Sequence, residues 1–234
     1  MYTFDDYLNM ATTMHRGCLC PGQVLGTRMA LLGCRLLGID PPDQEKRLFV
    51  FVEMDRCFAD AVAAVSGCRL GKRTLKHQDY GKAACTFYDD RTGRAVRIVA
   101  RDDSRDRVVL YAPPDLEKYQ AQAHAYRVMP EEELFVVQEV MVEIPPEDRP
   151  GRPISRVFCA RCGEGINDQR EVQINGQVLC RACAYGSYYS EVAQRENGQT
   201  EKVAHHYGPL PHPLPQLWGR GVRFPPLPGL GEGG

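Results

Sequence analysis

The stretch CARCGEGINDQREVQINGQVLCRAC, residues 159–183, decides the fold of the C-terminal part of the chain. It holds two Cys-x-x-Cys pairs with seventeen residues between them, a spacing typical of structural zinc sites. Asn175-Gly176 separates two short runs between the pairs, which is a strong β-hairpin signal. The stretch therefore predicts a zinc ribbon, a unit whose folding depends on its metal. The four ligands of this tetrahedral site would be Cys159, Cys162, Cys180 and Cys183.

Two other kinds of site would use the same four sulfur atoms: a redox dithiol pair and an iron–sulfur cluster. The spacing favours zinc over both. Four thiolates leave no open position on the metal, so the ribbon zinc is expected to be structural rather than catalytic. Ribbons bind proteins, nucleic acids or neighbouring domains, and the spacing does not distinguish among these partners.

The overall composition limits the partners further. The 234 residues carry a net charge of -1, which gives no general attraction to nucleic acid or to an anionic membrane. Apolar runs stay well below the ~18 residues of a membrane span, and the first ten residues, MYTFDDYLNM, do not resemble a secretory signal. We therefore expect a cytoplasmic protein. In a reducing compartment its ten cysteines are better interpreted as ligands, reactive thiols or buried side chains than as disulfides.

The N-terminal half has a second cysteine pattern, HRGCLCPGQVLG at residues 15–26. Proline favours the first position of a helix, so Pro21 makes Cys20 the expected N-cap. Free backbone N–H groups and the helix dipole would then lower the pKa of the Cys20 thiol. Cys18 and His15 precede it and are weaker candidates for the same site.

A second helix start carries the same feature. Asp55 is a good N-cap, which would put Cys57 in the first turn of the helix FADAVAAV, residues 58–65, ended by Gly67. We therefore expect Cys20 and Cys57 to share one site. The alternative is that both are small buried side chains, which is our interpretation of Cys34 and Cys85.

Hydrophobic patterns predict the remaining organisation. A helix should begin at Thr3 and a second should run from Pro21 to Gly38. Strands are expected over 47–53, on both sides of Asp90–Gly93, over 108–112 and over 134–144, and a polar helix over 115–129. The fold class is α+β, an antiparallel sheet with packed helices. Residues 1–146 form the metal-binding domain, 147–190 the four-cysteine ribbon, and 191–234 a polar, then Pro/Gly-rich extended tail.

Three stretches together resemble the FmdE family, named after the E subunit of formylmethanofuran dehydrogenase: GCLCPGQVLGTRMALLG, VEMDRCFADAVAAVSGCRLGKRTL and DYGKAACTF. With the ribbon, the resemblance covers roughly residues 5–190. The family motif reads Phe-His-Gly-His-Leu-Cys-Pro-Gly where this chain has residues 15–22. Leu19 to Gly22 agree, whereas Arg16 and Cys18 replace the two histidines. Cys57 matches the family's Asp-x-Cys, and Cys68 its Gly-Cys-x-x-Gly-Lys.

The resemblance implies a metal site in the N-terminal domain. Its best ligand set is Cys18, Cys20 and Cys57, completed by Cys68 or His15. Such a sulfur-rich site suits a second thiophilic metal, here expected to be zinc, with an open position for chemistry or metal transfer. The resemblance also implies a homodimer and association with a molybdenum or tungsten enzyme of one-carbon metabolism. We expect a metal-binding accessory protein; the alternatives are a ribbon-based regulatory binding module and a stand-alone enzyme.

Two further clusters have weaker interpretations. Lys72, Arg73 and Lys76 lie beside Cys68 and could bind an anion, although such runs are usually a solvated surface. His205, His206 and His212 in the tail could collect metal, although an ordinary extended tail explains the composition as well.

Overall fold

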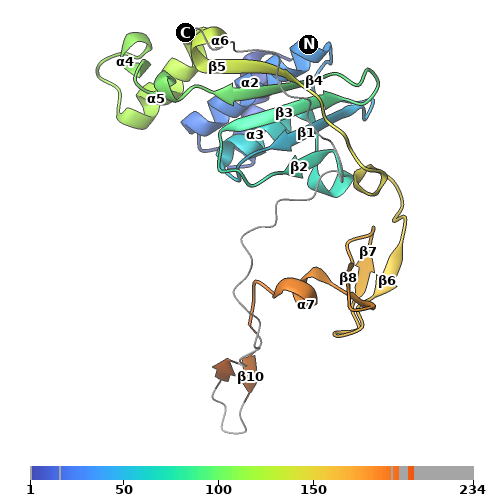
Figure 1. Cartoon of the computed structure of the whole chain (residues 1–234). Helices are drawn as coiled ribbons and strands as arrows, with labels where there is room; N and C mark the ends of the chain where they lie inside the picture. The colour runs from blue at the N-terminus through green and yellow to red at the C-terminus, as the bar shows by residue number, and fades with distance from the viewer. Residues whose placement is uncertain (1, 16, 191, 195–199, 203–234) are drawn as a thin grey trace, which may run out of the picture. The chain divides into compact units, whose positions relative to one another are not determined.

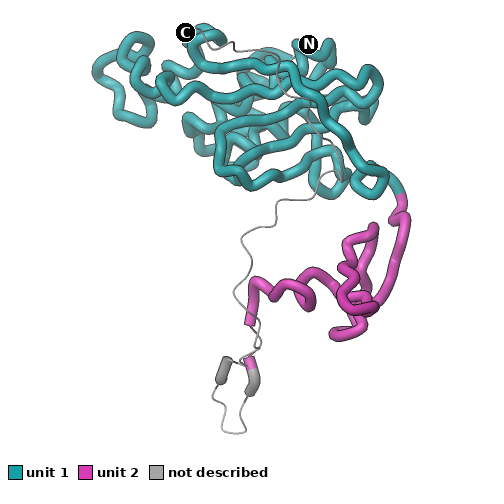
Figure 2. Tube along the Cα trace, in the orientation of Figure 1, with its two compact units in different colours: residues 1–151 teal, residues 152–234 magenta. Residues whose placement is uncertain are grey.

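The computed structural model describes residues 2–15, 17–190, 192–194 and 200–202. The chain divides into two compact units, residues 1–151 and 152–234 (Figure 2). Most of the expected tail, with its three histidines, lies outside the described residues. What is described there is an antiparallel pair of short strands, β10 (Val192–Gln194) and β11 (Thr200–Lys202).

A five-stranded sheet forms the centre of the first unit (Figure 1). Its spatial order is β2-β1-β3-β4-β5, and all neighbours are antiparallel except β1 and β2, which are parallel. Phe51 of β1 pairs with Thr86 of β3, and Ile98 of β4 pairs with Val137 of β5. The strands are β1 (Leu48–Val52), β2 (Leu75–His77), β3 (Ala84–Asp89), β4 (Ala95–Ala100) and β5 (Phe135–Val140).

Helices cover one face of this sheet, and α2 and α3 pack closely against each other and the strands. Alternate strand residues point to opposite faces, so Val50 and Phe87 join the core under the helices. Phe49 and Phe51 point to the other face, where Ile144 covers them. The helices are α1 (Phe4–Thr13), α2 (Pro21–Leu37), α3 (Cys57–Ser66), α4 (Val108–Tyr111), α5 (Lys118–Val128) and α6 (Glu131–Leu134), with 3₁₀ turns at Leu70–Lys72, Asp102–Ser104 and Pro146–Asp148.

Two glycines allow α2 to approach its neighbours. A Cβ atom added at Gly26 would lie 2.3 Å from the backbone oxygen of Phe58 in α3, and one at Gly33 would lie 2.4 Å from the ring of Phe87 in β3. Both distances are far below ordinary contact, so any larger residue would push α2 outward. The spacing of α2 from α3 therefore depends on Gly26.

The ends of the helices follow the sequence signals. At α1, which begins after Thr3 as expected, the side chain of Thr3 and the carboxylate of Asp6 form a capping box. Cys20 is the N-cap of α2 and Pro21 its first residue, as expected. Gly38 ends α2 with φ +66°, and Gly67 ends α3 with φ +78°, conformations that glycine adopts without steric cost.

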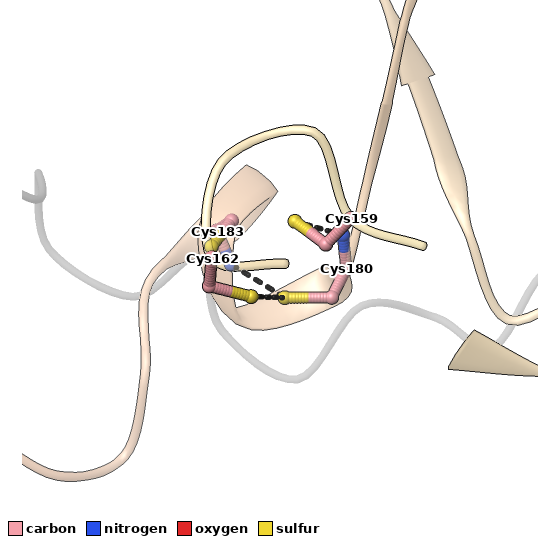
Figure 3. A group of neighbouring side chains, drawn as sticks. All are labelled: Cys159, Cys162, Cys180 and Cys183. Carbon is pink, nitrogen blue, oxygen red and sulfur yellow. Dashed lines mark hydrogen bonds between the residues drawn. The ribbon is translucent and has the colours of Figure 1, made fainter. Parts of the chain in front are cut away.

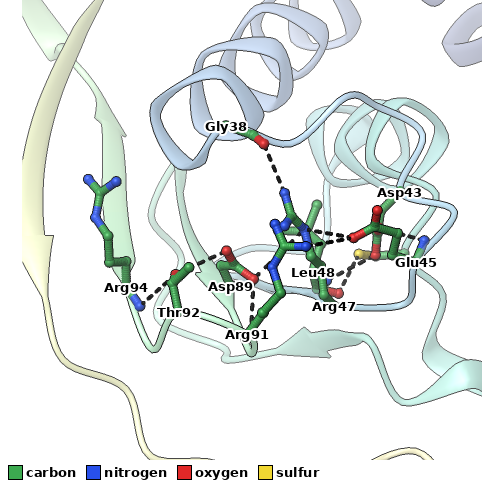
Figure 4. A network of polar contacts seen from close by, with 10 residues as sticks. Gly38, Asp43, Glu45, Arg47, Leu48, Asp89, Arg91, Thr92 and Arg94 are labelled. Carbon is green, nitrogen blue, oxygen red and sulfur yellow. Dashed lines mark hydrogen bonds and ion pairs between the residues drawn. The ribbon is translucent and has the colours of Figure 1, made fainter.

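A buried polar network fixes the end of α2 against the sheet (Figure 4). Asp89 is fully buried at the β3–β4 hairpin, where it accepts hydrogen bonds from the backbone N–H of Arg91 and the hydroxyl of Thr92, both at 3.0 Å. Arg47 donates to the backbone oxygen of Gly38 at 2.8 Å, and its Nε lies 3.9 Å from Asp89. The hairpin predicted at Asp90–Gly93 is thereby tied to the C-terminal end of α2.

Three predictions of local structure were wrong. Val108–Tyr111 is a helical turn rather than a strand, and Val109 and Leu110 lie exposed, so a short apolar run did not indicate burial here. Strand β5 ends at Val140, because the chain then crosses to cover the second face of the sheet. The N-cap of α3 is Arg56 rather than Asp55.

The cysteine-bearing part of the second unit contains two β-hairpins and a short helix. Its small core joins Cys159, Ile166, Leu179 and Cys183. The pairs are β6 (Arg156–Phe158) with β7 (Gly165–Asn167) and β8 (Val172–Ile174) with β9 (Gln177–Leu179), followed by α7 (Arg181–Tyr185). Across the described part of the chain, no helix combines the length and apolar character needed to span a membrane.

Candidate metal sites

The four ribbon cysteines converge on one point (Figure 3). Their sulfur atoms all lie within 4.8 Å of one another, and those of Cys162 and Cys180 are 3.9 Å apart. Tetrahedral zinc with Zn–S bonds of ~2.3 Å needs sulfur atoms about 3.8 Å apart, so the geometry fits. The turn after β6 positions Cys159 and Cys162, and the start of α7 positions Cys180 and Cys183.

Backbone N–H groups already favour a thiolate in this cluster. The N–H of Cys162, and then that of Cys180, lower the pKa of the Cys159 thiol to about 6. Burial and the surrounding sulfur atoms raise the pKa of Cys183 to about 12. Four thiols this close cannot all lose their protons without a cation, and a bound Zn²⁺ would supply that charge. The ribbon is therefore a zinc-binding unit.

The N-terminal cysteine loop turns sharply between α1 and α2. The backbone oxygen of Thr12 accepts hydrogen bonds from His15 N–H at 2.8 Å and Gly17 N–H at 2.9 Å. Cys18 lies exposed on this turn, and Cys20 is half-buried at the start of α2. Gln23 holds that start in place, because its side chain accepts from the Cys20 N–H at 3.0 Å and donates to the backbone oxygen of Ala11 at 3.3 Å.

The close packing of α2 and α3 brings Cys20 next to Cys57, the first residue of α3. A Cβ atom added at Gly22 would lie 3.7 Å from the Cys20 sulfur and 3.4 Å from the Cys57 Cβ. A side-chain hydrogen bond with Cys57 also contributes to the pKa of the Cys20 thiol. The two half-buried thiols thus meet at the N-terminal ends of two helices.

The predicted direction of the Cys20 pKa was wrong. Burial raises the pKa of this thiol, and the neighbouring Cys57 raises it further. The N–H groups of Gln23 and Gly22 do lower it, as expected, but they do not outweigh burial. Burial therefore favours the protonated form of the Cys20 thiol, and a bound cation would favour its thiolate.

His15 contacts α3 close to this pair, through a residue that the sequence analysis missed. Its Nε2 atom lies 2.9 Å from the carboxylate of Asp60. Asp60 follows Cys57 by three residues, so the two side chains share one face of α3. That spacing was the available signal for Asp60.

Cys68 lies elsewhere. It follows α3, at the opposite end of the helix from Cys57, about 15 Å away along the axis of a ten-residue helix. Its buried thiol donates to the backbone oxygen of Leu48 at 3.3 Å, and burial raises its pKa to about 11. Cys34 and Cys85 are fully buried in the core. Within the described residues, the ribbon set forms the one group of three or more such ligands within 4.8 Å.

A cavity of about 410 Å³ opens beside the N-terminal loop. Leu19, between Cys18 and Cys20, forms part of its wall together with Leu8 of α1 and Val24 of α2. The rest of the wall comes from α5 and from the residue two positions before it, and carries both apolar and polar side chains: Leu116, Tyr119, Gln120, Ala123, His124 and Arg127.

The basic cluster near Cys68 contacts the segment that follows the sheet. Arg73 donates to the backbone oxygen of Glu147 at 2.6 Å, and Lys76 donates to that of Asp148 at 2.5 Å. These contacts give two of the three cations a structural role in the first unit.

Comparisons with known proteins match both units. The family model described as FmdE, Molybdenum formylmethanofuran dehydrogenase operon, matches residues 15–136. The model of the prokaryotic dksA/traR C4-type zinc finger matches residues 153–189. A curated relative from Archaeoglobus fulgidus, named a probable S-adenosyl-L-methionine-binding protein, is 28% identical over 201 residues. The alignment takes in 76% of this chain but only 52% of that relative, so the chain spans about half its length.

The fold also has a solved counterpart. The crystal structure of an FmdE-like protein of the tungsten formylmethanofuran dehydrogenase type, from Syntrophus aciditrophicus, superimposes with a TM-score of 0.54 at 21% identity. The superposition covers 80% of this chain and 95% of that protein. The FmdE match extends over more than half of the sequence and includes both cysteine-bearing helix starts. The chain therefore belongs to the FmdE family.

Proposed function

We propose that the protein is a metal-binding accessory protein of molybdenum- or tungsten-linked one-carbon metabolism. It acts either as a component of a formylmethanofuran dehydrogenase-like complex or as a factor that handles metal or sulfur. Family membership supports the pathway, and the zinc-binding ribbon supports the metal chemistry. The observation that carries the proposal is the meeting of Cys20 and Cys57 at two helix N-termini.

These two thiols would hold a second thiophilic metal, zinc in the resting protein. Two neighbouring sulfur donors suit such an ion, because a bound metal takes the place of the thiol protons. Cys18 and His15 are the remaining candidate ligands on the loop. Cys68 is left out because it lies at the far end of α3. A site with three protein ligands keeps one position open for exchange or transfer.

Elemental analysis of the purified full-length protein tests the second site. We expect two zinc ions per chain in the wild type and one in each of Cys20→Ser and Cys57→Ser. Cys162→Ser should also lose one, from the ribbon. Cys34→Ser, a buried cysteine away from both sites, is the matched control and should keep two. Full metal content in Cys20→Ser would contradict an N-terminal metal site.

The quaternary proposals are a homodimer and binding to the dehydrogenase in the cytoplasm. Strand β5 ends the described sheet and exposes Val136 and Val137, which supports pairing between two copies. Light scattering after size exclusion should give twice the mass of one chain. Mixing with the purified tungsten enzyme should shift the protein to the larger complex. Separate elution would exclude a role as a component of that complex and leave the handling role.

A further inference from the structure

The cavity beside the N-terminal loop has the size and the lining of a small-molecule site. Leu8 of α1, Leu19 of the loop and Val24 of α2 contribute apolar side chains to it. The other lining residues recur at intervals of three and four, the spacing of a single helix face: Leu116, Tyr119, Gln120, Ala123, His124 and Arg127. The volume of about 410 Å³ lies in the range of ~300–1,000 Å³ that is typical of ligand pockets.

Packing holds this face of α5 in place without a ligand. Arg28 of α2 donates to the backbone oxygen of Tyr126, at 2.9 Å, and to that of Met129. Ala123 and Ala125 belong to the same core cluster as the apolar residues of α2. The wall is therefore formed by the fold itself, as is usual for small-molecule sites.

Arg127 supplies a positive charge to the lining. It is the one permanently charged residue among the lining residues that the structure describes, and no carboxylate belongs to the lining. Its guanidinium lies 5.3 Å from the centre of the Phe4 ring, and Nη2 donates to Asp5 of α1. Within the described part of the chain Asp5 is its hydrogen-bond partner, so the N–H groups on the other nitrogens can bind an anion. The Asp5 side chain is 61% exposed and competes only weakly.

The neutral part of the lining suits an aromatic ligand. The Tyr119 side chain is 73% exposed, so its ring can stack on a bound ring as well as on solvent-facing neighbours. Gln120 and His124 follow it on the same helix face and offer polar groups to the edge of such a ligand.

We propose that this cavity binds a compact aromatic anion, whose rings lie against the apolar walls and Tyr119 and whose anionic group binds Arg127. The site requires no metal at Cys20, so the inference goes beyond the proposed function and does not depend on it.

Two fluorescent dyes test the site in the full-length protein. Anilinonaphthalene sulfonate is a compact aromatic anion, and phenylnaphthylamine has the same rings without the sulfonate. Each dye should show a saturable rise in fluorescence on titration. Arg127→Met should weaken binding of the sulfonate dye by about 10-fold, the scale of a lost charge-assisted hydrogen bond, and should leave the neutral dye unaffected. Arg105→Met removes an exposed arginine outside the lining and, as the matched control, should change neither.

Asp5→Asn should have the opposite effect from Arg127→Met. Removing the competing carboxylate should tighten binding of the sulfonate dye by about two- to fivefold, the scale of an exposed ion pair. If Arg127 only joins α5 to α1, both variants break the same contact, and their effects on dye binding should have the same sign.

Filling the cavity should exclude both dyes. Ala123→Leu adds bulk to the lining and should abolish the saturable fluorescence of each dye. Ala123 is buried, so circular dichroism must show that this variant folds. Leu116→Glu tests the same wall from a less buried position, and its carboxylate should repel the sulfonate dye. Leu110→Ser removes an exposed apolar side chain of α4 outside the lining, and this control should bind both dyes normally.

Displacement of the bound sulfonate dye tests the class of ligand. Naphthoate, an aromatic carboxylate, should displace the dye. Decanoate, an aliphatic carboxylate, should displace it much less, because it has no ring to stack on Tyr119. Tyr119→Ala should remove most of this difference.

Four results would overturn the inference: unchanged dye binding in folded Ala123→Leu and in Leu116→Glu, equal losses of the two dyes in Arg127→Met, weaker sulfonate binding in Asp5→Asn, or equal displacement by decanoate. Each is distinct from failure of the proposed function. A protein that holds no metal at Cys20 but binds the sulfonate dye through Arg127 would contradict the proposed function and support this site.

Discussion

Replacing Gly26 by alanine is expected to destabilise the first unit, because the added methyl group would enter the contact between α2 and α3. Its Cβ would lie 2.3 Å from the backbone oxygen of Phe58 and 2.9 Å from the Cβ of Ala61. A backbone atom cannot rotate away, so the helices must separate. Overpacking of this kind costs ~1–3 kcal/mol of stability. The contact with a backbone atom places Gly26→Ala at the upper end of this range. Alanine regains ~1 kcal/mol of helix propensity.

The net expectation is a loss of about 2 kcal/mol, or a fall in Tm of roughly 4–8 °C for a domain of this size. Gly22→Ala provides the matched control in the same helix. There the added Cβ would meet the Cys57 Cβ at 3.4 Å, an ordinary contact. That variant should be as stable as the wild type, or slightly more stable through helix propensity.

Thermal and urea unfolding, followed by far-UV circular dichroism, provide the measurement. The helices that dominate this signal belong mainly to the first unit, which matters because two units need not unfold together. Gly26→Ala should also lose metal from the N-terminal site, as α3 moves away from Cys20. The packing argument is wrong if Gly26→Ala has a Tm at or above that of the wild type, or if the Tm of Gly22→Ala is lowered by the same amount as that of Gly26→Ala.

Three further predictions follow from other contacts. Because the pKa of Cys159 is lowered to about 6, this thiol is deprotonated above that pH. Zinc release from the ribbon, followed with a colorimetric chelator, should therefore rise as the pH falls through that value. Release that is already complete near pH 8 would contradict this. Arg97 donates to both carboxylate oxygens of the buried Glu53, at 2.6 and 2.7 Å. Arg97→Met should therefore lower the free energy of unfolding, measured with urea, by ~3–5 kcal/mol, because it leaves the buried carboxylate unpaired. Adding Glu53→Gln should restore most of the loss. If Arg97→Met alone is as stable as the wild type, the argument from the buried pair is wrong. In the native, metal-free protein, a thiol reagent at neutral pH should modify Cys18 and spare Cys68 until unfolding, because burial excludes the reagent and raises the Cys68 pKa to about 11; equal rates would show that this part of the core is open.

Local signals were sufficient for much of the fold. The ribbon was predictable because its ligands and hairpin lie within one short stretch, and spacing alone brings Cys159 and Cys162 into one turn. The start and the end of α2 were predictable because Pro21 and Gly38 act on their own backbone. The hairpin at Asp90–Gly93 was predictable for the same reason.

Features set by long-range packing were not predictable. The position of Cys68 is not such a feature, because the helix predicted over residues 58–65 already separates it from Cys57. The Cys20 pKa depends on burial under neighbouring elements, and burial outweighs the helix end that the sequence did indicate. The apolar run at 108–112 turned out to be exposed. Asp60 required knowing where the loop after α1 places His15.

The residue at the start of α2 has a consequence for variant selection. Serine, threonine, asparagine and aspartate cap helices better than most other residues, and oxygen accepts backbone hydrogen bonds more strongly than sulfur does. A library selected for heat resistance alone should therefore replace Cys20 with one of these oxygen-bearing residues. The variants that such a screen selects would be more stable but would no longer carry the thiol where α2 and α3 meet.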